Sequence, residues 1–261
     1  MTMKVSVIMP TYNSAAFIGE SITSVLNQSY VNFDLYIVDD CSTDDTVEFI
    51  RANFQDERLT LIQNARNMGP GYSRRLGIST SDGDYLAFCD SDDVWHSSKI
   101  ETQMSNATFT DDPDCLICFT SYRLSDTIKT QLVRARDRVD FTVMLQRNYI
   151  GMSTAVVKRS GIGNINFPDY RLRQDWAYWL DLLAQSKKYY ALGIINSLVN
   201  INIQEQSISK KKWNLIIPTY NIYNRHLGFT KINSFFRTLQ FLFYQFKEIK
   251  NREYIFHDSE Q

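Results

Sequence analysis

The sequence predicts an α/β protein with a mostly parallel central sheet flanked by helices and a C-terminal helical tail. Two observations favour this class. Across residues 1–95, short β-branched runs alternate with amphipathic helical segments, and a βαβαβαβ order gives a parallel sheet with helices on both faces. The 261-residue chain is 44% hydrophobic and 22% charged, which is typical of a globular protein with a sizeable core.

The first half contains four predicted strands and the helices that connect them. Residues 4–9 form a buried strand, and we expect Pro10 to end it. The elements that follow are a helix capped by Asn13 or Ser14, a strand at 33–38, a helix capped by Ser42 or Thr43, a strand at 59–62, a loop at 69–71, a helix near 73–79 and a strand at 85–89.

The second half has a less regular pattern. The elements predicted there are strands at 116–121 and 155–157, a helix at 175–186, further strands at 189–192 and 198–203, and a helix at 232–247. No internal repeat is convincing. We therefore expect one large α/β unit that a helical tail completes.

Charge and cysteine content narrow the function classes. The net charge of −1 argues against a nucleic-acid binder. Cys115 and Cys118 have CxxC spacing inside an apolar run, so we predict buried core residues and not metal ligands. The N-terminal apolar run is too short for a secretory signal, and no stretch is long enough to span a bilayer. These features favour a reducing cytoplasm.

Two acidic clusters follow predicted strands. Asp39 and Asp40 come after the second strand, and Asp90-Ser91-Asp92-Asp93 comes after the fourth. Ligands of parallel sheets bind beyond the carboxyl ends of the strands, so clusters that are fifty residues apart are expected to converge.

The second cluster is the sharper signal. Carboxylates at Asp90 and Asp92 form an oxygen-rich site that suits Mg²⁺ or Mn²⁺, which would neutralise a departing diphosphate. The alternative is a solvated acidic turn, in which three carboxylates repel one another.

The local sequence leaves the roles of Asp39, Asp40 and Asp175 open. Asp39 or Asp40 can accept a ring N–H of a nucleotide base, but the same stretch is also good helix-capping chemistry. Asp175 can take a proton from an attacking hydroxyl. Its position at a predicted helix start, however, favours the interpretation as an acid in the first turn of a helix.

Taken together, these stretches resemble glycosyltransferase family 2, a large inverting family with the GT-A fold. The matching segments occur in the family's order: VSVIMPTYN at 5–13, VDDCSTDDT at 38–46, NMGPGYSRR at 67–75, GDYLAFCDSDDVW at 83–95 and RQDW at 173–176. The resemblance implies a nucleotide-sugar-binding half at 1–95, an acceptor-binding half of the same domain at 96–205, and a basic aromatic helical tail at 206–261.

The resemblance also assigns roles. Pro10, Tyr12 and Asp40 would line the base and ribose pocket. Asp92 would be the direct metal ligand of a DxD motif, and Asp90 would lie nearer the ribose. Asp175 would be the catalytic base, which overrides the local interpretation. We also assign Arg74 and Ser91 to the nucleotide-sugar site.

Two departures from the family pattern stand out: Arg74-Arg75 replaces the usual Arg-Asn, and Gln174-Asp175 replaces the frequent Glu-Asp.

The implied reaction is a single in-line displacement that inverts the anomeric carbon and gives a β-linkage. A UDP-hexose is the expected donor, with thymidine and guanosine nucleotides as alternatives for the base. Family members of this size often build bacterial O-antigen, capsule or other surface polysaccharide on a lipid-diphosphate carrier. A sugar on such a carrier is therefore the expected acceptor.

The predicted tail is basic and rich in aromatic residues. Between residues 210 and 253 the sequence has nine Lys or Arg and two Glu. An amphipathic helix of this kind binds anionic membrane surfaces, which would make the protein peripheral on the inner face of the cell membrane. The alternatives are packing of the apolar stripe against the body, or a dimer contact.

Two rival functions remain open from the sequence. The run YLAFCDSDDVW also fits haloacid dehalogenase-like phosphatases, in which Asp90 would be the nucleophile. That family usually carries this motif on its first strand, whereas three strand-helix units precede it here. The second rival is a non-catalytic nucleotide-binding module. A dehydrogenase is disfavoured, because the first strand leads to PTYNSA and not to GxGxxG.

Overall fold

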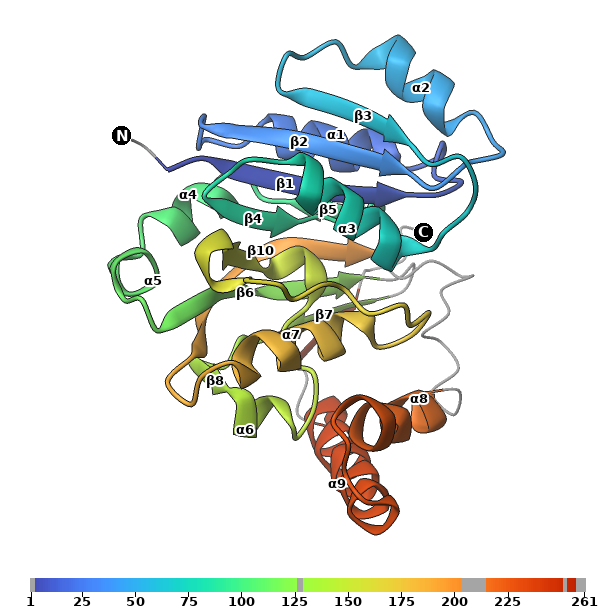
Figure 1. The fold of residues 1–261 in the computed structure, drawn as a ribbon. Helices are drawn as coiled ribbons and strands as arrows, with labels where there is room; N and C mark the ends of the chain where they lie inside the picture. The colour runs from blue at the N-terminus through green and yellow to red at the C-terminus, as the bar shows by residue number, and fades with distance from the viewer. Residues whose placement is uncertain (1–2, 126–128, 203–214, 251–252, 257–261) are drawn as a thin grey trace.

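The computed structural model describes residues 3–125, 129–202, 215–250 and 253–256. In these ranges a mixed sheet of eleven strands forms the centre of the molecule (Figure 1). The strands are β1 Val5–Thr11, β2 Phe33–Asp39, β3 Leu59–Gln63, β4 Tyr85–Phe88, β5 Asp93–Trp95, β6 Cys115–Ser125, β7 Lys129–Val133, β8 Arg138–Asp140, β9 Val156–Lys158, β10 Tyr190–Asn202 and β11 Glu253–Phe256.

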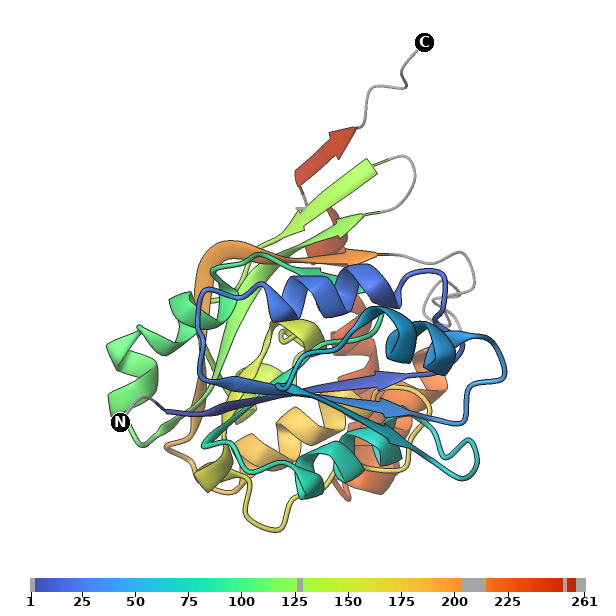
Figure 2. The ribbon, with the colours of Figure 1, turned by 90° about the horizontal axis from the view of Figure 1, so that it is seen from above.

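The helices surround this sheet. They are α1 Ile18–Leu26, α2 Thr46–Asn53, α3 Pro70–Thr80, α4 Lys99–Met104, α5 Ala107–Asp111, α6 Phe141–Met144, α7 Gln174–Ala184, α8 Ile216–Asn221 and α9 Lys231–Lys250. Seen from above, α1 and α2 cover one face of the first strands, while α3 and α7 cover the other (Figure 2).

The sheet order is β11-β7-β6-β9-β4-β1-β2-β3, and β10 pairs with β5, β6 and β8. The strands β4, β1, β2 and β3 are parallel, as predicted for the first half. In the second half β10 runs parallel to β6, and the pairs that involve β5, β7, β8, β9 and β11 are antiparallel. The α/β fold class is confirmed.

Side chains of β1 alternate between two cores. Val5, Val7 and Met9 join the cluster that α1 covers, whereas Ile8 joins the cluster that contains α7. Helix α3 lies so close to β1 that a Cβ at Gly77 would be 2.7 Å from Cγ2 of Ile8. The predicted core cysteines, Cys115 and Cys118, are fully buried.

The prediction that Pro10 ends the first strand was wrong. Pro10 pairs with Val38, and the strand continues to Thr11. The pairing of β1 with β4 stops at Ile8 and Phe88. The position of the missing N–H of Pro10 faces that open side, so the proline removes no ladder hydrogen bond.

The predicted helix caps were also wrong. Helix α1 begins at Ile18, and α2 begins at Thr46. Asn13 and Ser14 instead join the two loops, because Thr43 N–H donates to Asn13 Oδ1 at 2.8 Å and Ser14 N–H donates to Thr46 Oγ1 at 2.8 Å. Residue types that often cap helices therefore connect the loop after β1 to the start of α2 and the loop before it.

The boundaries of two further elements differ from prediction. Pro70 and Gly71 are the first residues of α3 and not a loop, since proline fits the first turn of a helix. The two strands predicted at 189–192 and 198–203 form the single strand β10, which irregularities between Ile194 and Val199 bend. Residue 203 lies outside the described residues.

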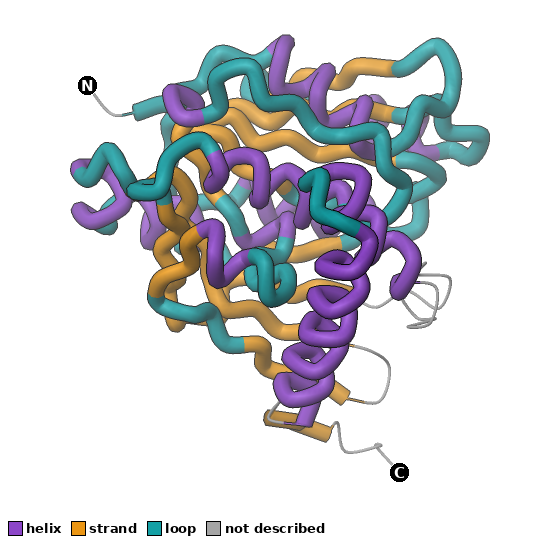
Figure 3. The backbone as a smooth tube through the Cα atoms, turned by 60° about the horizontal axis from the view of Figure 1, so that its bottom comes forward, coloured by secondary structure: helices purple, strands orange, loops and turns teal. Residues whose placement is uncertain are grey.

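Helix α9 packs on the body with an unexpected face. Ser234, Thr238 and Phe241 are buried against the body, and the ring of Phe241 lies 5.0 Å from that of Trp176 in α7. The helix lies along the outside of the domain (Figure 3). None of the helices within the described ranges has the length and apolarity that crossing a bilayer requires.

The predicted apolar stripe of α9 faces away from the body. Its side chains are between 37% and 72% exposed, and they are Ile232, Phe235, Phe236, Leu239, Leu242, Phe243 and Phe246. We call these residues the apolar face of α9. The alternative in which the stripe packs against the body was wrong. Of the tail's basic residues, those at 210–212 and 252 lie outside the described residues.

Candidate active site

The acidic turn after β4 is held by ionic and hydroxyl contacts. Arg74 Nη2 in α3 contacts Asp90 Oδ1 at 2.5 Å. The Arg74 side chain is 7% exposed, and its guanidinium carbon lies 5.6 Å from the centre of the Phe167 ring. Arg74 therefore fixes one carboxylate of the predicted DxD motif from within the protein.

The third aspartate of the motif has a structural position. Asp93 is buried and accepts a hydrogen bond from Ser153 Oγ. The same hydroxyl accepts the backbone N–H of Asp90 at 3.0 Å. Burial and the charges of Asp90 and Asp92 raise the pKa of Asp93 well above its usual range. Ser153, which the sequence did not single out, therefore ties both ends of the turn together.

Asp92 is the carboxylate best suited to a cation. Burial and the neighbouring charge of Asp90 raise its pKa to about 6, and a bound divalent cation would remove this penalty. Within the described residues no three or more His, Cys, Asp or Glu side chains form a metal cage. Two carboxylates fit a hard cation whose other ligands are phosphates and water.

The carboxylate of Asp40 accepts hydrogen bonds from the loop that enters α3. Its Oδ1 accepts hydrogen bonds from Met68 N–H and Asn64 Nδ2, both at 2.8 Å, and its Oδ2 accepts Gly69 N–H at 2.7 Å. The residue is 3% exposed. Asp40 thus shapes the wall of the predicted nucleotide pocket, and direct contact of its carboxylate with a base stays a prediction.

The remaining predicted donor-site residues lie around the carboxyl end of β1. Pro10 is buried in the strand, and Tyr12 just beyond it is 46% exposed. Ser91 Oγ lies 3.0 Å from Ser14 Oγ, and Ser21 Oγ of α1 donates to the carbonyl of Ser91 at 2.8 Å. The fold thus brings the predicted residues of the first half to one rim of the sheet.

Asp175 stands in the first turn of α7, on the same side of the molecule. Burial raises its pKa, and the positive charges of Arg173 and Arg74 partly oppose this shift while Asp90 adds to it. Asn148 Nδ2 donates to Asp175 Oδ2 at 2.7 Å. A carboxyl group that accepts a hydrogen bond from a neutral donor and whose pKa is raised by burial is compatible with the predicted role of a general base.

The starts of α3 and α7 are in direct contact. A Cβ at Gly71 would lie 2.7 Å from Oε1 of Gln174. Gln174, which replaces an expected glutamate, therefore lies against α3. Arg75, the other departure from the family pattern, contacts Asp169 at 2.5 Å and the carbonyl of Phe167 at 2.7 Å. It holds the segment that precedes α7 and does not point into the donor site.

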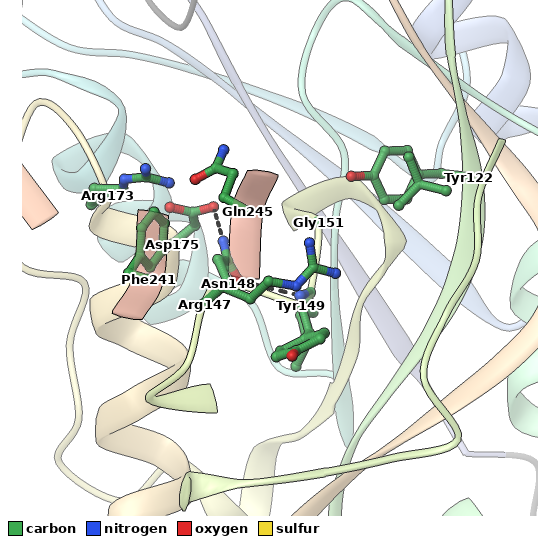
Figure 4. Close-up of a pocket in the computed structure, with 11 residues that line it drawn as sticks. Tyr122, Arg147, Asn148, Tyr149, Gly151, Arg173, Asp175, Phe241 and Gln245 are labelled. Atoms are coloured by element: carbon green, nitrogen blue, oxygen red, sulfur yellow. Dashed lines mark hydrogen bonds between the residues drawn. The ribbon is translucent and has the colours of Figure 1, made fainter. Parts of the chain in front are cut away.

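A pocket of about 210 Å³ opens beside Asp175 (Figure 4). Its charged and amide lining comes from Arg147, Asn148, Arg173, Asp175 and Gln245, with Phe241 of α9 as an apolar wall. Sequence reasoning missed Arg173, although its place two residues before the predicted base was the available signal. It also missed Asn148, for which we find no local signal.

Comparison with known proteins places these features in a family. The sequence profile described as "Glycosyl transferase family 2" matches residues 6–176. The putative teichuronic acid biosynthesis glycosyltransferase TuaG of Bacillus subtilis is 34% identical over 223 residues, which cover 84% of this chain and 86% of TuaG. The Escherichia coli UDP-Glc:alpha-D-GlcNAc-diphosphoundecaprenol beta-1,3-glucosyltransferase WfaP is 30% identical, with 84% of each chain covered.

Solved structures share the fold. Staphylococcus aureus TarS 1–349 in complex with UDP-GlcNAc aligns with a TM-score of 0.69 at 20% identity, covering 92% of this chain and 72% of that one. The mannosyltransferase PcManGT from Pyrobaculum calidifontis, in complex with GDP-Man and Mn²⁺, aligns with a TM-score of 0.63 at 18% identity, covering 85% and 62%. These likenesses confirm the predicted GT-A fold.

Proposed function

Because this chain belongs to glycosyltransferase family 2 and is a hexosyltransferase, we propose that it transfers a hexose from a UDP-sugar to a lipid-diphosphate-linked sugar in bacterial surface-polysaccharide synthesis, such as that of O-antigen. Family membership supports neither the phosphatase nor the non-catalytic alternative. The proposed donor and acceptor classes are those in the name of WfaP. The observation that carries the proposal is the meeting of Asp90, Arg74 and Asp175 at one rim.

The donor site is built from the first half of the chain. Pro10, Tyr12 and the loop that Asp40 holds surround the base and ribose, while Arg74 and Ser91 lie at the turn that meets the phosphates. Support comes from their shared position at the carboxyl ends of β1, β2 and β4, where ligands of such sheets bind.

Asp92, with Asp90 beside it, would hold Mn²⁺ or Mg²⁺ as a DxD motif. The bound cation would neutralise charge on the departing nucleoside diphosphate. The raised pKa of Asp92 supports this assignment, since its carboxylate lies in a setting that favours a cation.

Asp175 acts as the base of a single displacement. Its carboxylate takes the proton of the acceptor hydroxyl, whose oxygen forms a bond to the anomeric carbon of the donor sugar. The bond from that carbon to the β-phosphate oxygen breaks, and its electron pair leaves with the nucleoside diphosphate. Attack from the opposite side inverts the anomeric centre and gives a β-linkage.

A panel of nucleotide sugars with a short-chain GlcNAc-diphosphate lipid and Mn²⁺ or Mg²⁺ tests the proposal. UDP release that depends on acceptor and metal, with a β-linked product by NMR, is expected. Asp92→Ala and Asp175→Asn should abolish transfer, and Asp175→Asn should still bind UDP. Wild-type turnover by Asp175→Asn would disprove the base assignment, and phosphate release from simple monoesters would revive the phosphatase reading.

The apolar face of α9 rests on an anionic membrane surface, so that the enzyme works peripherally at the cytoplasmic face of the cell membrane. Exposed Lys231 and Lys247 border this face on a helical wheel. Aromatic side chains flanked by lysines are typical of helices that lie in a lipid interface. An acceptor carried on a lipid would be presented at the same surface.

Sedimentation with phosphatidylglycerol vesicles tests this surface. The double variant Phe235→Ser/Phe243→Ser should lose most vesicle binding. The matched control, Val31→Ser/Ile195→Ser, removes two exposed apolar side chains elsewhere and should retain it. Equal sedimentation of both variants, or a wild-type dimer that only the first variant disrupts, would refute a membrane role.

A further inference from the structure

Arg173 lies beside the proposed base, and part of its guanidinium has no hydrogen-bond partner among the described residues. Its Nε and Nη2 are buried, and in the described part of the chain neither has a hydrogen-bond partner. The guanidinium carbon lies 4.9 Å from the ring of Phe241 and 5.9 Å from that of Trp176. Burial lowers the pKa of Arg173, while the charge of Asp175 raises it. Leaving such donors unpaired is costly, which indicates a ligand.

The backbone of Arg173 supports this inference. Its φ of 64° lies in the left-handed region, which is uncommon for a residue other than glycine. Non-glycine residues in such conformations cluster at ligand-binding sites, where the surrounding structure maintains them. Here the conformation accompanies a guanidinium that lines the pocket beside Asp175 (Figure 4).

The pocket favours an anion. Among the described residues, its charged lining consists of Arg147, Arg173 and one acid, Asp175. A guanidinium can donate two parallel hydrogen bonds to phosphate oxygens. Phe241 and Gln245 extend the lining onto α9, whose apolar face is the proposed membrane contact.

The pocket and the donor turn are built from different residues. Asp175, Arg173, Asn148 and α9 line the pocket, whereas the donor turn is held by the pair of Arg74 and Asp90, neither of which lines the pocket. A base must lie at the acceptor hydroxyl, so we assign the pocket that Asp175 lines, and that the donor-turn residues do not, to the acceptor.

We propose that Arg173, with Arg147 beside it, binds the diphosphate of the lipid-linked acceptor in this pocket. This inference rests on the proposed function and adds the subsite that recognises the acceptor's phosphates. The proposed ligand is a pair of anionic phosphate groups attached to a sugar. A membrane lipid headgroup shares part of that chemistry, so the test separates the two.

Steady-state kinetics with two acceptors that carry the same sugar provide the main test, in vesicle-free solution with the full-length chain. One acceptor is a short-chain alkyl diphosphate, and the other is an alkyl glycoside without phosphate. For Arg173→Met, KM for the diphosphate acceptor should rise about 10- to 100-fold, the loss expected for hydrogen bonds to a charged group. KM for the neutral acceptor and for the donor should stay unchanged.

Arg173→Lys should recover part of the lost affinity, because it restores the charge without the planar fork. Arg171→Met is the matched control, since this nearby arginine is exposed, and it should behave as wild type. An equal rise in KM for both acceptors, or a rise confined to the donor, would overturn the proposal.

Two binding measurements keep this result independent of the transfer reaction. With saturating UDP and no metal, inorganic pyrophosphate should bind wild type at least tenfold more tightly than Arg173→Met. Equal affinities would refute the subsite, even if no acceptor proves active and the proposed function itself fails. Phosphatidylglycerol vesicles should bind both proteins equally, and weaker vesicle binding by Arg173→Met would assign Arg173 to headgroups and overturn the inference.

Discussion

The two sides of the proposed active site differ in how their groups are satisfied. On the donor side, Asp40 accepts three hydrogen bonds and Arg74 Nη2 pairs with Asp90, although Arg74 Nε has no partner among the described residues. On the acceptor side, Nε and Nη2 of Arg173 are buried without a hydrogen-bond partner among those residues, and α9 exposes an apolar face. More of the donor side is therefore held by contacts within the chain, whereas we propose that a ligand and a membrane surface complete the acceptor side.

The largest expected effect tests how much the internal hydrogen bonds of the donor side contribute to stability. Asp40→Ala leaves the N–H groups of Met68 and Gly69 and the amide of Asn64 without their acceptor in a buried setting. We expect the free energy of unfolding to fall by about 3–5 kcal/mol, because each buried donor left without its acceptor costs about 1–3 kcal/mol. Urea denaturation measures it, with Asp45→Ala as the exposed control. A change below that of the control would contradict the comparison.

The second prediction compares two phenylalanines of α9. Phe241→Ala removes a side chain that is 2% exposed and contacts Trp176, so it should cost about 3 kcal/mol. Phe243→Ala, at a position that is 64% exposed, should change stability by less than about 0.5 kcal/mol. Thermal unfolding of both variants decides this, and comparable losses would mean that the apolar face of α9 is covered in solution.

The third prediction concerns Asp92, the proposed cation ligand of the donor side. The pKa of Asp92 in the folded state is raised to about 6, so its ionised form destabilises the metal-free protein. Asp92→Asn should therefore stabilise it at pH 7 by about 1–3 kcal/mol. The gain should shrink as pH falls from about 6 and vanish below about 4, where the carboxyl is protonated in both states.

Metal titration is the control for this prediction. Added Mn²⁺ should raise the melting temperature of wild type and leave that of Asp92→Asn unchanged. Stabilisation of both proteins to the same degree would place the cation elsewhere.

The smallest predicted effect concerns Asn148, which positions the base. Its amide favours the ionised form of Asp175, so Asn148→Ala should raise the pKa of that carboxyl further. We expect kcat to fall about tenfold and the acid limb of the pH–kcat profile to move to higher pH. UDP affinity should not change. A fall in kcat without movement of the limb would indicate a purely structural role.

The first half of the chain was more predictable from sequence than the second half. The β-runs that lead to Asp39–Asp40 and Asp90–Asp93 are local patterns, and parallel topology alone brings their ends together. The turn chemistry was harder, because Asn13 and Ser14 fit helix caps as well as they fit bridges between loops.

The second half of the chain depends on contacts between residues that are distant in the sequence. A periodic pattern located α9, but it did not show that Ser234, Thr238 and Phe241 would face the body. The proposed role of Arg173 depends on its left-handed backbone conformation and on its contact with Phe241, 68 positions later in the chain. Neither feature can be predicted from local sequence propensity.

The close approach of α3 to β1 at Gly77 has a consequence for engineering. Arg74 lies one turn earlier on the same helix, so a methyl group at 77 would lift the helix and shift the guanidinium that holds Asp90. Donor affinity could thus be tuned from a position that touches no substrate. Glycine at this point sets the distance between the helix that holds the proposed metal-binding turn and the strand beneath it.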